Sequence, residues 1–580
     1  MGALTMRIHN LNLINESCQS GLFTKICNII NRQIKEHTTG ISENETINIV
    51  LAIDDKIGIE GYMISKNANG DTIILGNDQL GLIFGVGRYL HVGGYSKNGF
   101  IPGECFGISI PKRKTRGMYL ANPSWNYYGQ APMEDIEHYI EDLMLWGCNS
   151  IMVTLPRASN LNENNEEKLT RMHSIKRTKD IIAYAKNLGM TVAAIIAANL
   201  SFSSPPVELL ADWTGGHDGY LRNLAAHTHT EICPSKPGGL DYILKGQRES
   251  LREFIDFPPD IICLWPYDAG GCTCNLCKPW GGNGFIKVSK ALSKLIKQMF
   301  SKTEIMISTW YFDLFTSGEW NILKKDIDKD KSWLDLLMVH FNMEMGIPEC
   351  VTKEGRIPGS VPAIDFPEIS MFGCVPWGGF GANPLPNRLQ SMWDMSKKYL
   401  NGGYPYSEGI FDDINKVICL QFYWGDYEIS DIIRQYVSYE FSSEIADDVL
   451  RSIILIEQAT SHIRIDEEGK QHVYPDPLVP WIGEQRFIID NTDGIEEAYM
   501  IIQKADQKIP DHIHKQKRWR MLYLRAICDY ELLKNDFFIS DKCEEALHEL
   551  TDIYLAKNYP YHLSPPTRES IQEARGIFTI

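Results

Sequence analysis

Ile151-Met152-Val153-Thr154 is a short apolar run, and Val192-Ala193-Ala194-Ile195-Ile196-Ala197 is a second one. Between them, residues 180–188 have the pattern of a helix, and Gly189 follows in the position that commonly ends one. An apolar strand, a helix and a second apolar strand form a βαβ unit with parallel strands. The same alternation continues on both sides, from residue 115 to about residue 406.

Eight short segments in this region are predicted as strands. They are Gly117–Leu120, Ile151–Thr154, Val192–Ala197, Ile261–Leu264, Ile305–Thr309, Leu336–His340, Ile369–Phe372 and, with the weakest pattern, Gly403–Tyr406. Eight βα units in roughly 290 residues fit an α/β fold of the (β/α)8 TIM-barrel type with extended loops. The alternative is an open, doubly wound parallel sheet.

A smaller α+β domain is expected before the barrel. Strands are predicted at Ile47–Ile53, Gly61–Ile64 and Thr72–Leu75, and a helix that Asp78 caps follows them. The segment "GYMI" at 61–64 and the pattern N-D-x-x-G-x-x-x-G-x-x-R-x-L at 77–90 resemble the accessory domain of family 20 hexosaminidases and family 67 α-glucuronidases. The resemblance covers about residues 40–110 and implies a domain without catalytic residues.

The chain is therefore expected to have three domains. An N-terminal α+β domain covers residues 1–113, a (β/α)8 barrel covers residues 114–428, and a helical domain covers residues 429–580. The C-terminal helices, which resemble those of family 67, show no catalytic spacing. We expect them to support the barrel or to form a contact in a homo-oligomer.

Composition and charge narrow the function. The 580 residues include 57 basic and 74 acidic side chains, a formal net charge of −17, which disfavours nucleic acid and anionic membranes as partners. No apolar stretch is long enough for a transmembrane helix, and the first residues lack a signal-peptide pattern. The 14 cysteines are scattered rather than arranged as a disulfide framework, so we expect a cytoplasmic protein.

Aromatic side chains are concentrated where the predicted strands end. In a TIM barrel the carboxyl ends of the strands carry the active site, and aromatic rings there can pack on the C–H faces of a sugar. The substrate-binding candidates are Trp125, Trp265, Tyr267, Trp310, Asp313, Trp377, Tyr406 and Trp424. The pattern predicts a site for an oligosaccharide or another glycoside.

Isolated acids lie among these aromatic residues. Hydrolysis of a glycosidic bond usually needs two carboxyl groups, one of them kept protonated by apolar surroundings. Asp268 and Glu344 have such neighbours and are predicted as the catalytic pair. Glu408 is predicted to bind substrate hydroxyls and is the reserve catalytic residue. No organic cofactor is needed for this chemistry.

The barrel also resembles known glycosidase families, with departures. Family 20 enzymes carry an adjacent Asp-Glu pair after the fourth strand, whereas Asp268-Ala269 here offers a single acid. The Gly-rich, Cys-containing segment after that strand resembles family 163 endo-N-acetylglucosaminidases. The resemblance implies polysaccharide or glycan degradation, but no family's catalytic set is present in full.

Three cysteines follow the fourth predicted strand within six residues. Cys272, Cys274 and Cys277 could hold a soft metal such as Zn²⁺ together with Cys233, or with His227 or His229 as the fourth ligand. Such a site would be structural. The alternatives are three reduced thiols in a tight turn or a redox-labile pair of thiols.

Two other functions compete with glycoside hydrolysis. A carbohydrate-binding protein on a degenerate barrel would explain the missing Asp-Glu pair. A metal-dependent hydrolase would use His217, His227, His229 and Asp268, although no two of these histidines have ligand spacing on a predicted helix or strand.

Overall fold

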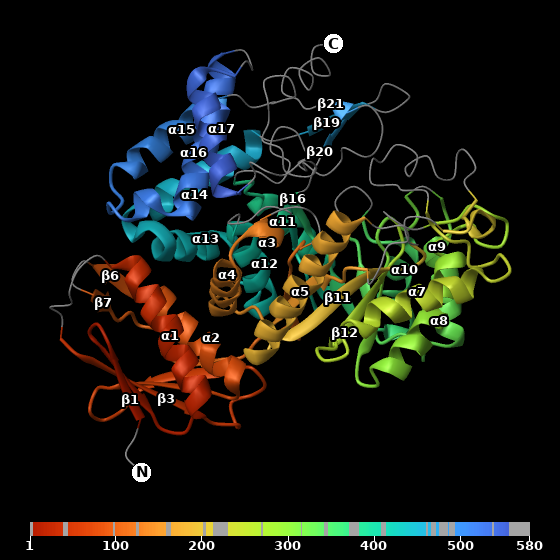
Figure 1. Ribbon diagram of the computed structural model, residues 1–580. Helices are drawn as coiled ribbons and strands as arrows, with labels where there is room; N and C mark the ends of the chain where they lie inside the picture. The colour runs from red at the N-terminus through yellow and green to blue at the C-terminus, as the bar shows by residue number, and fades with distance from the viewer. Residues whose placement is uncertain are drawn as a thin grey trace.

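The structure is a computed structural model. It describes residues 4–38, 45–96, 99–122, 127–157, 164–200, 205–212, 230–267, 271–314, 316–341, 346–370, 382–407, 413–459, 462–465, 471–474, 485–486, 493–535 and 539–555. Figure 1 shows an N-terminal sheet, a central barrel surrounded by helices, and a C-terminal group of helices.

The N-terminal domain contains a six-stranded sheet in the order β1-β2-β3-β5-β4-β8. Its strands are β1 (Leu4–Ile8), β2 (Leu11–Asn15), β3 (Ile47–Ile53), β5 (Thr72–Gly76), β4 (Tyr62–Lys66) and β8 (Gly107–Ser109). β3 is parallel to both of its neighbours, and β4 is antiparallel to β5. The three strands predicted from sequence are confirmed.

Two helices, α1 (Ser20–His37) and α2 (Gln79–Val92), pack on this sheet. Asp78 caps α2, because its side chain accepts a hydrogen bond from the Gly81 backbone N–H at 2.9 Å. A Cβ atom at Gly85 would lie 2.8 Å from the Ile74 side chain, and one at Gly87 would lie 2.2 Å from the Leu145 carbonyl oxygen. The glycines therefore allow α2 to approach both its own sheet and the barrel domain.

The central domain is a closed barrel of eight parallel strands. In order around the barrel they are β9 (Thr115–Tyr119), β10 (Ser150–Thr154), β11 (Thr191–Ala197), β12 (Ile261–Trp265), β13 (Glu304–Ser308), β14 (Leu336–Val339), β15 (Ala363–Asp365) and β17 (Gly402–Gly403). β17 pairs with β9 through Gly403 and Arg116. This pairing closes the ring, so the TIM barrel is confirmed and the open sheet is wrong.

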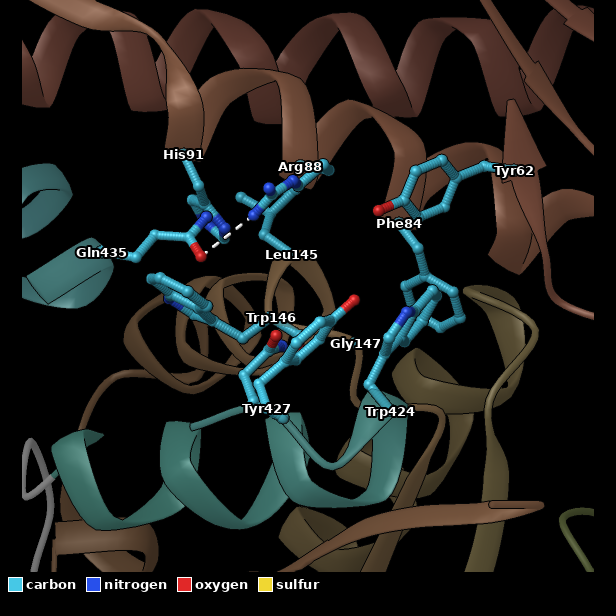
Figure 2. Close-up of a pocket in the computed structure, with 11 residues that line it drawn as sticks. Tyr62, Phe84, Arg88, His91, Leu145, Trp146, Gly147, Trp424, Tyr427 and Gln435 are labelled. Atoms are coloured by element: carbon cyan, nitrogen blue, oxygen red, sulfur yellow. Dashed lines mark hydrogen bonds between the residues drawn. The ribbon is translucent and has the colours of Figure 1, made fainter. Parts of the chain in front are cut away.

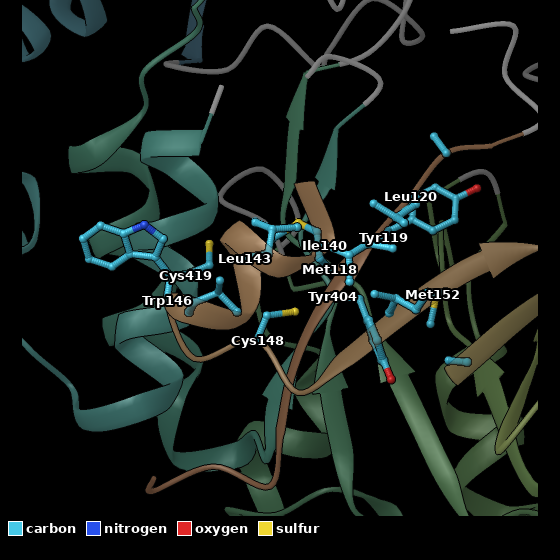
Figure 3. Packing of buried hydrophobic residues seen from close by; sticks show 14 of the residues in the cluster. Met118, Tyr119, Leu120, Ile140, Leu143, Trp146, Cys148, Met152, Tyr404 and Cys419 are labelled. Atoms are coloured by element: carbon cyan, nitrogen blue, oxygen red, sulfur yellow. The ribbon is translucent and has the colours of Figure 1, made fainter. Parts of the chain in front are cut away.

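Helices surround the barrel. The principal ones are α4 (Met133–Leu145), α5 (Asn165–Asn187), α7 (Gly239–Arg252), α8 (Gly284–Met299), α9 (Glu319–Lys329), α11 (Pro386–Ser396) and α12 (Asp413–Gly425), with α3 (Tyr127–Gln130) and α10 (Glu349–Glu354) as short additions. Figure 3 shows side chains of α4 and α12 turned toward β9, among them Ile140, Leu143 and Cys419. Inside the barrel, the buried Tyr404 hydroxyl lies 2.6 Å from Ser150 Oγ.

The seventh strand differs from the sequence prediction. It is β15, Ala363–Asp365, and not 369–372. Residues Glu368–Ser370 instead form β16, which pairs with β18 (Tyr406–Ser407) in a separate two-stranded sheet. Residues 369–372 are the more apolar run, but the short segment before them makes the hydrogen bonds to the neighbouring barrel strand.

The C-terminal region is mainly helical. It contains α13 (Ile429–Val437), α14 (Ala446–Ala459), α15 (Asp493–Asp506), α16 (Lys517–Lys534) and α17 (Asp541–Ile553). A three-stranded sheet of β19 (His462–Ile465), β20 (Gln471–Tyr474) and β21 (Gln485–Arg486) was not expected. Arg518 of α16 donates to Asp142 of α4 at 2.8 Å, which ties this region to the barrel. The domain limits at 113 and 428 remain predictions.

Candidate functional site

Five aromatic rings lie together at the carboxyl ends of the barrel strands. They are Tyr119, Trp265, Trp310, Phe366 and Tyr406, and we call them the aromatic floor. The ring centres of Trp265 lie 5.3 Å from those of both Trp310 and Phe366. Phe366 lies 5.4 Å from Tyr406, which stacks on Tyr119 at 5.1 Å. The floor therefore connects side chains at or just beyond the ends of β9, β12, β13 and β15 with Tyr406 of β18.

Only part of the aromatic floor is open to a ligand. Trp265 and Tyr406 are half-buried, whereas Tyr119, Trp310 and Phe366 are buried. A flat ring with one exposed face suits the C–H surface of a pyranose. Of the predicted substrate-binding residues, the structure brings Trp265, Trp310 and Tyr406 together, and their binding role remains a prediction.

A buried carboxylate holds the loops after β12 and β13. Glu319, the first residue of α9, accepts hydrogen bonds from the Tyr267 hydroxyl and from the Gly281 N–H. Its second oxygen accepts from the Asp313 N–H at 2.9 Å, and Asp313 Oδ1 in turn accepts from the Glu319 N–H at 2.6 Å. Desolvation raises the pKa of Glu319 to about 7.

This network changes the interpretation of two candidates. Tyr267 is buried and directs its hydroxyl to Glu319, so it supports the loop and offers no open face to a sugar. Asp313 is half-buried and uses one oxygen at the start of α9. A contact between Asp313 and a substrate stays a prediction.

Two acids near the strand ends were not chosen from sequence. Asp365 ends β15, and burial raises its pKa from 3.8 to about 7, although its Oδ1 accepts the Phe366 N–H at 2.9 Å. Glu231 is fully buried beyond β11, and desolvation raises its pKa to about 7 against the opposing charge of Arg157. A carboxyl group that titrates near neutral pH can donate a proton.

The sequence carried little signal for either acid. Asp365 lies in β15, whereas the sequence pattern placed the seventh strand at residues 369–372. Glu231 stands in a long connection between two strands, beside polar residues. The seventh strand, correctly placed, would have identified Asp365 as a strand-end residue.

The predicted catalytic residues Asp268, Glu344 and Glu408 lie outside the described residues, as do Trp125 and Trp377. In the chain, the three acids come shortly after β12, β14 and β18, respectively. Their assignment therefore stays a prediction.

The structure corrects the placement of Trp424. It lies near the end of α12, which returns from the carboxyl end of the barrel to the amino end, where the Trp424 carbonyl accepts a backbone hydrogen bond from Lys112. Figure 2 shows Trp424 beside Phe84 and facing Tyr62, and its Nε1 donates to Ser109 Oγ at 2.8 Å. Trp424 is buried between the N-terminal domain and the barrel, away from the aromatic floor.

The four predicted metal-binding cysteines lie together. Cys233, Cys272, Cys274 and Cys277 form the four-cysteine cluster, whose sulfur atoms all lie within 4.8 Å of one another. Hydrogen bonds from the Cys272 and Cys277 thiols lower the pKa of Cys233, and the same contacts raise the pKa values of Cys272 and Cys277. The alternative ligands His227 and His229, and also His217, lie outside the described residues.

Comparisons with known proteins agree on the fold. Neither a protein-family model nor a curated protein matches the sequence. Among solved structures, the chain is similar to a family 115 4-O-methyl-α-glucuronidase with specificity for decorated arabinogalactans, with a TM-score of 0.58 at 10% identity over 97% of this chain and 78% of that chain.

Two further similarities point the same way. A family 89 glycoside hydrolase from Clostridium perfringens gives a TM-score of 0.57 at 11% identity over 92% of this chain, which spans only 64% of that enzyme's length. A family 20 exo-β-N-acetylglucosaminidase from Vibrio harveyi gives 0.50 at 12% identity, over 78% of this chain and 76% of that chain.

The shared property is the architecture of glycoside hydrolases with a TIM barrel. The expected resemblance to such enzymes is confirmed at the level of the fold, and residue roles do not transfer at these identities. Among the helices in the described ranges, none combines the length and apolar composition needed to cross a bilayer.

Proposed function

We propose that this protein is a glycoside hydrolase that cleaves a glycosidic bond at the carboxyl end of the barrel. The aromatic floor carries the proposal, because Trp265 and Tyr406 are half-buried on it, at the end where TIM-barrel enzymes have their active sites. The glycoside hydrolase architecture of the similar structures supports the same class.

The proposed chemistry uses the acids that follow the strands. Asp268 and Glu344 form the proposed pair, in which one carboxyl group protonates the leaving oxygen and the other acts as nucleophile or activates water. Glu408 binds substrate hydroxyls and is the reserve catalytic residue. No organic cofactor takes part, since proton transfer and charge stabilisation are sufficient for hydrolysis.

The test compares D268N, E344Q and E408Q with the unmodified protein on a panel of aryl glycosides. The panel should include α-glucuronides and β-N-acetylglucosaminides, for which the similar family 115 and family 20 enzymes are named. It should also include α-N-acetylglucosaminides, because a similar family 89 enzyme from Clostridium perfringens was solved with its substrate GlcNAc-α-1,4-galactose. Loss of a catalytic acid is expected to reduce kcat by about 10²–10⁴-fold.

Exposed acids provide matched controls. D256N and E349Q change a carboxylate to an amide at exposed positions and should leave turnover unchanged. Full turnover in both D268N and E344Q would contradict the assignment of the pair.

A carbohydrate-binding protein without catalysis is the second candidate. The single acid in Asp268-Ala269, where family 20 enzymes carry a pair, favours it. Calorimetric binding of an oligosaccharide without turnover of any glycoside in the panel would support this candidate over the first.

A further inference from the structure

The four-cysteine cluster points to a metal site. We propose that its four thiolates bind one structural Zn²⁺ ion, which fastens the loop after β12 to the segment that precedes α7. This inference is independent of the proposed function, because a structural metal can be measured whether or not the protein hydrolyses glycosides.

The spacing of the sulfur atoms fits a tetrahedral ion. Four sulfurs at about 2.3 Å from a central Zn²⁺ lie about 3.8 Å from one another. Cys233 Sγ lies 3.8 Å from Cys274 Sγ and 3.9 Å from Cys277 Sγ. Because all four sulfurs are mutually within 4.8 Å, small side-chain adjustments complete the tetrahedron.

The same spacing argues against disulfides. A disulfide brings two sulfurs to about 2.05 Å and would separate the four thiols into two pairs. Here Cys233 is almost equally far from two different partners, and the described cysteines are free thiols. A mutual arrangement of four thiols is expected for a shared central ion.

A neighbouring hydroxyl group contacts the cluster. The Cys277 thiol lies 3.4 Å from Ser235 Oγ, and Ser235 comes two residues after Cys233 in the chain. Hydrogen bonds of this kind orient metal ligands.

Nearby cations suit the charge of the loaded site. Four thiolates and one Zn²⁺ have a net charge of −2, which needs compensation in a buried position. The Lys236 ammonium interacts electrostatically with Cys233 and Cys272, while it also pairs with Asp212 at 2.8 Å. The Lys287 ammonium of α8 donates to Ser235 Oγ at 3.3 Å.

The ion would join two distant parts of the chain. Cys233 comes from the segment before α7, whereas the other three ligands follow β12. The buried Asn199 already bridges these segments, since its Nδ2 donates to the Ile232 and Gly271 carbonyls at 2.9 Å each. Gly271 comes shortly after Asp268, so the cluster fixes the chain at one end of the loop that carries the proposed catalytic acid.

The first test measures the metal in the full-length protein purified without chelators. Elemental analysis should find about one zinc per chain, and a mercurial reagent that blocks thiols should release it to a chromogenic chelator. A zinc content near zero, stoichiometric iron in place of zinc, or a protein mass that shows disulfides would overturn the proposal.

The second test uses matched serine variants. C277S should lose nearly all zinc, while C350S, which changes a half-buried cysteine outside the cluster, should keep it. If C277S fails to fold, the measurements on the unmodified protein still decide the question. Full zinc content in a folded C277S would contradict Cys277 as a ligand.

Hydrogen exchange tests the fastening role. Removal of zinc with a strong chelator should speed amide exchange in residues 230–236 and 271–284, because those segments would lose their shared anchor. Residues 493–506 of α15 serve as the internal control. Equal exchange in the two cysteine-bearing segments before and after zinc removal would contradict the role.

Discussion

Two aromatic clusters lie at opposite ends of the same barrel. The aromatic floor at the carboxyl end has two half-buried rings, Trp265 and Tyr406, next to buried ones. The cluster around Trp424 at the amino end is covered by the N-terminal domain, and the Arg116 guanidinium lies 5.1 Å from the Trp424 ring. One cluster has an open surface, and the other is an interior contact.

The two tryptophans lie at opposite ends of the barrel because the strand and the helix that carry them run in opposite directions. Trp265 ends a strand, so it points to the end of the barrel where loops form a site. Trp424 lies near the C-terminus of α12, which runs in the opposite direction, so its side chain is at the amino end of the barrel. A tryptophan close to a predicted strand in sequence is therefore a binding candidate only when it follows the strand directly.

The largest expected effect is loss of stability in W424A. Removing a buried tryptophan costs about 3–5 kcal/mol, and the hydrogen bond to Ser109 is lost as well, so we expect about 5 kcal/mol. Chemical denaturation measures the change. The folded fraction of W424A should keep its kcat/KM. A loss of activity at unchanged stability would show that Trp424 also contributes to the proposed active site.

The next effect concerns the dependence of stability on pH. The folded pKa of Asp365, about 7, lies above its ordinary value of 3.8. Its stabilising contribution is therefore complete below pH 3.8 and is lost as the pH rises through 7. The difference of about three pKa units corresponds to about 4 kcal/mol.

D365N should remove this dependence. The asparagine Oδ1 can still accept the Phe366 N–H but does not titrate. Unfolding free energies measured from pH 4 to pH 8 should fall less steeply in D365N than in the unmodified protein. Parallel curves would show that Asp365 ionises normally in the folded state.

The smallest effect is expected for W265A. The ring is half-buried, so its removal should cost less stability than that of Trp424. If a sugar stacks on it, kcat/KM should fall roughly tenfold, mainly through KM, and W265F should retain most of the activity. Steady-state kinetics on the best glycoside measures this. Unchanged kinetics in W265A would place the substrate elsewhere.

The barrel could be predicted because its strands are buried on both faces. Segments such as Ile151–Thr154 and Ile261–Leu264 are continuous apolar runs, which is typical of parallel strands. β15 contains an acid, and β17 consists of two glycines, so neither has a hydropathy signal. Their assignment depends on hydrogen bonds to neighbouring strands, which a local pattern does not contain.

Part of the site could be predicted because apolar runs in the sequence identify most of the barrel strands. Trp265 and Trp310 lie at the ends of strands that were correctly placed. Tyr406, predicted as the last residue of the eighth strand, lies in β18 beyond β17, and the structure brings the three rings together. Asp365 and Glu231 were missed because their raised pKa values come from burial by distant residues. Burial of this kind is a property of the folded chain.

The sequence by itself determined the repeating βα units, the cap at Asp78 and the close spacing of three cysteines. Each of these features is a pattern of residues that are close together in the sequence. Only the tertiary structure decided that the barrel closes through Gly403 and Arg116, that Trp424 is sealed at the amino end, and that Cys233 joins the other three thiols. These three features depend on contacts between segments that are far apart in the chain, and the packing of the whole domain sets the energies of those contacts.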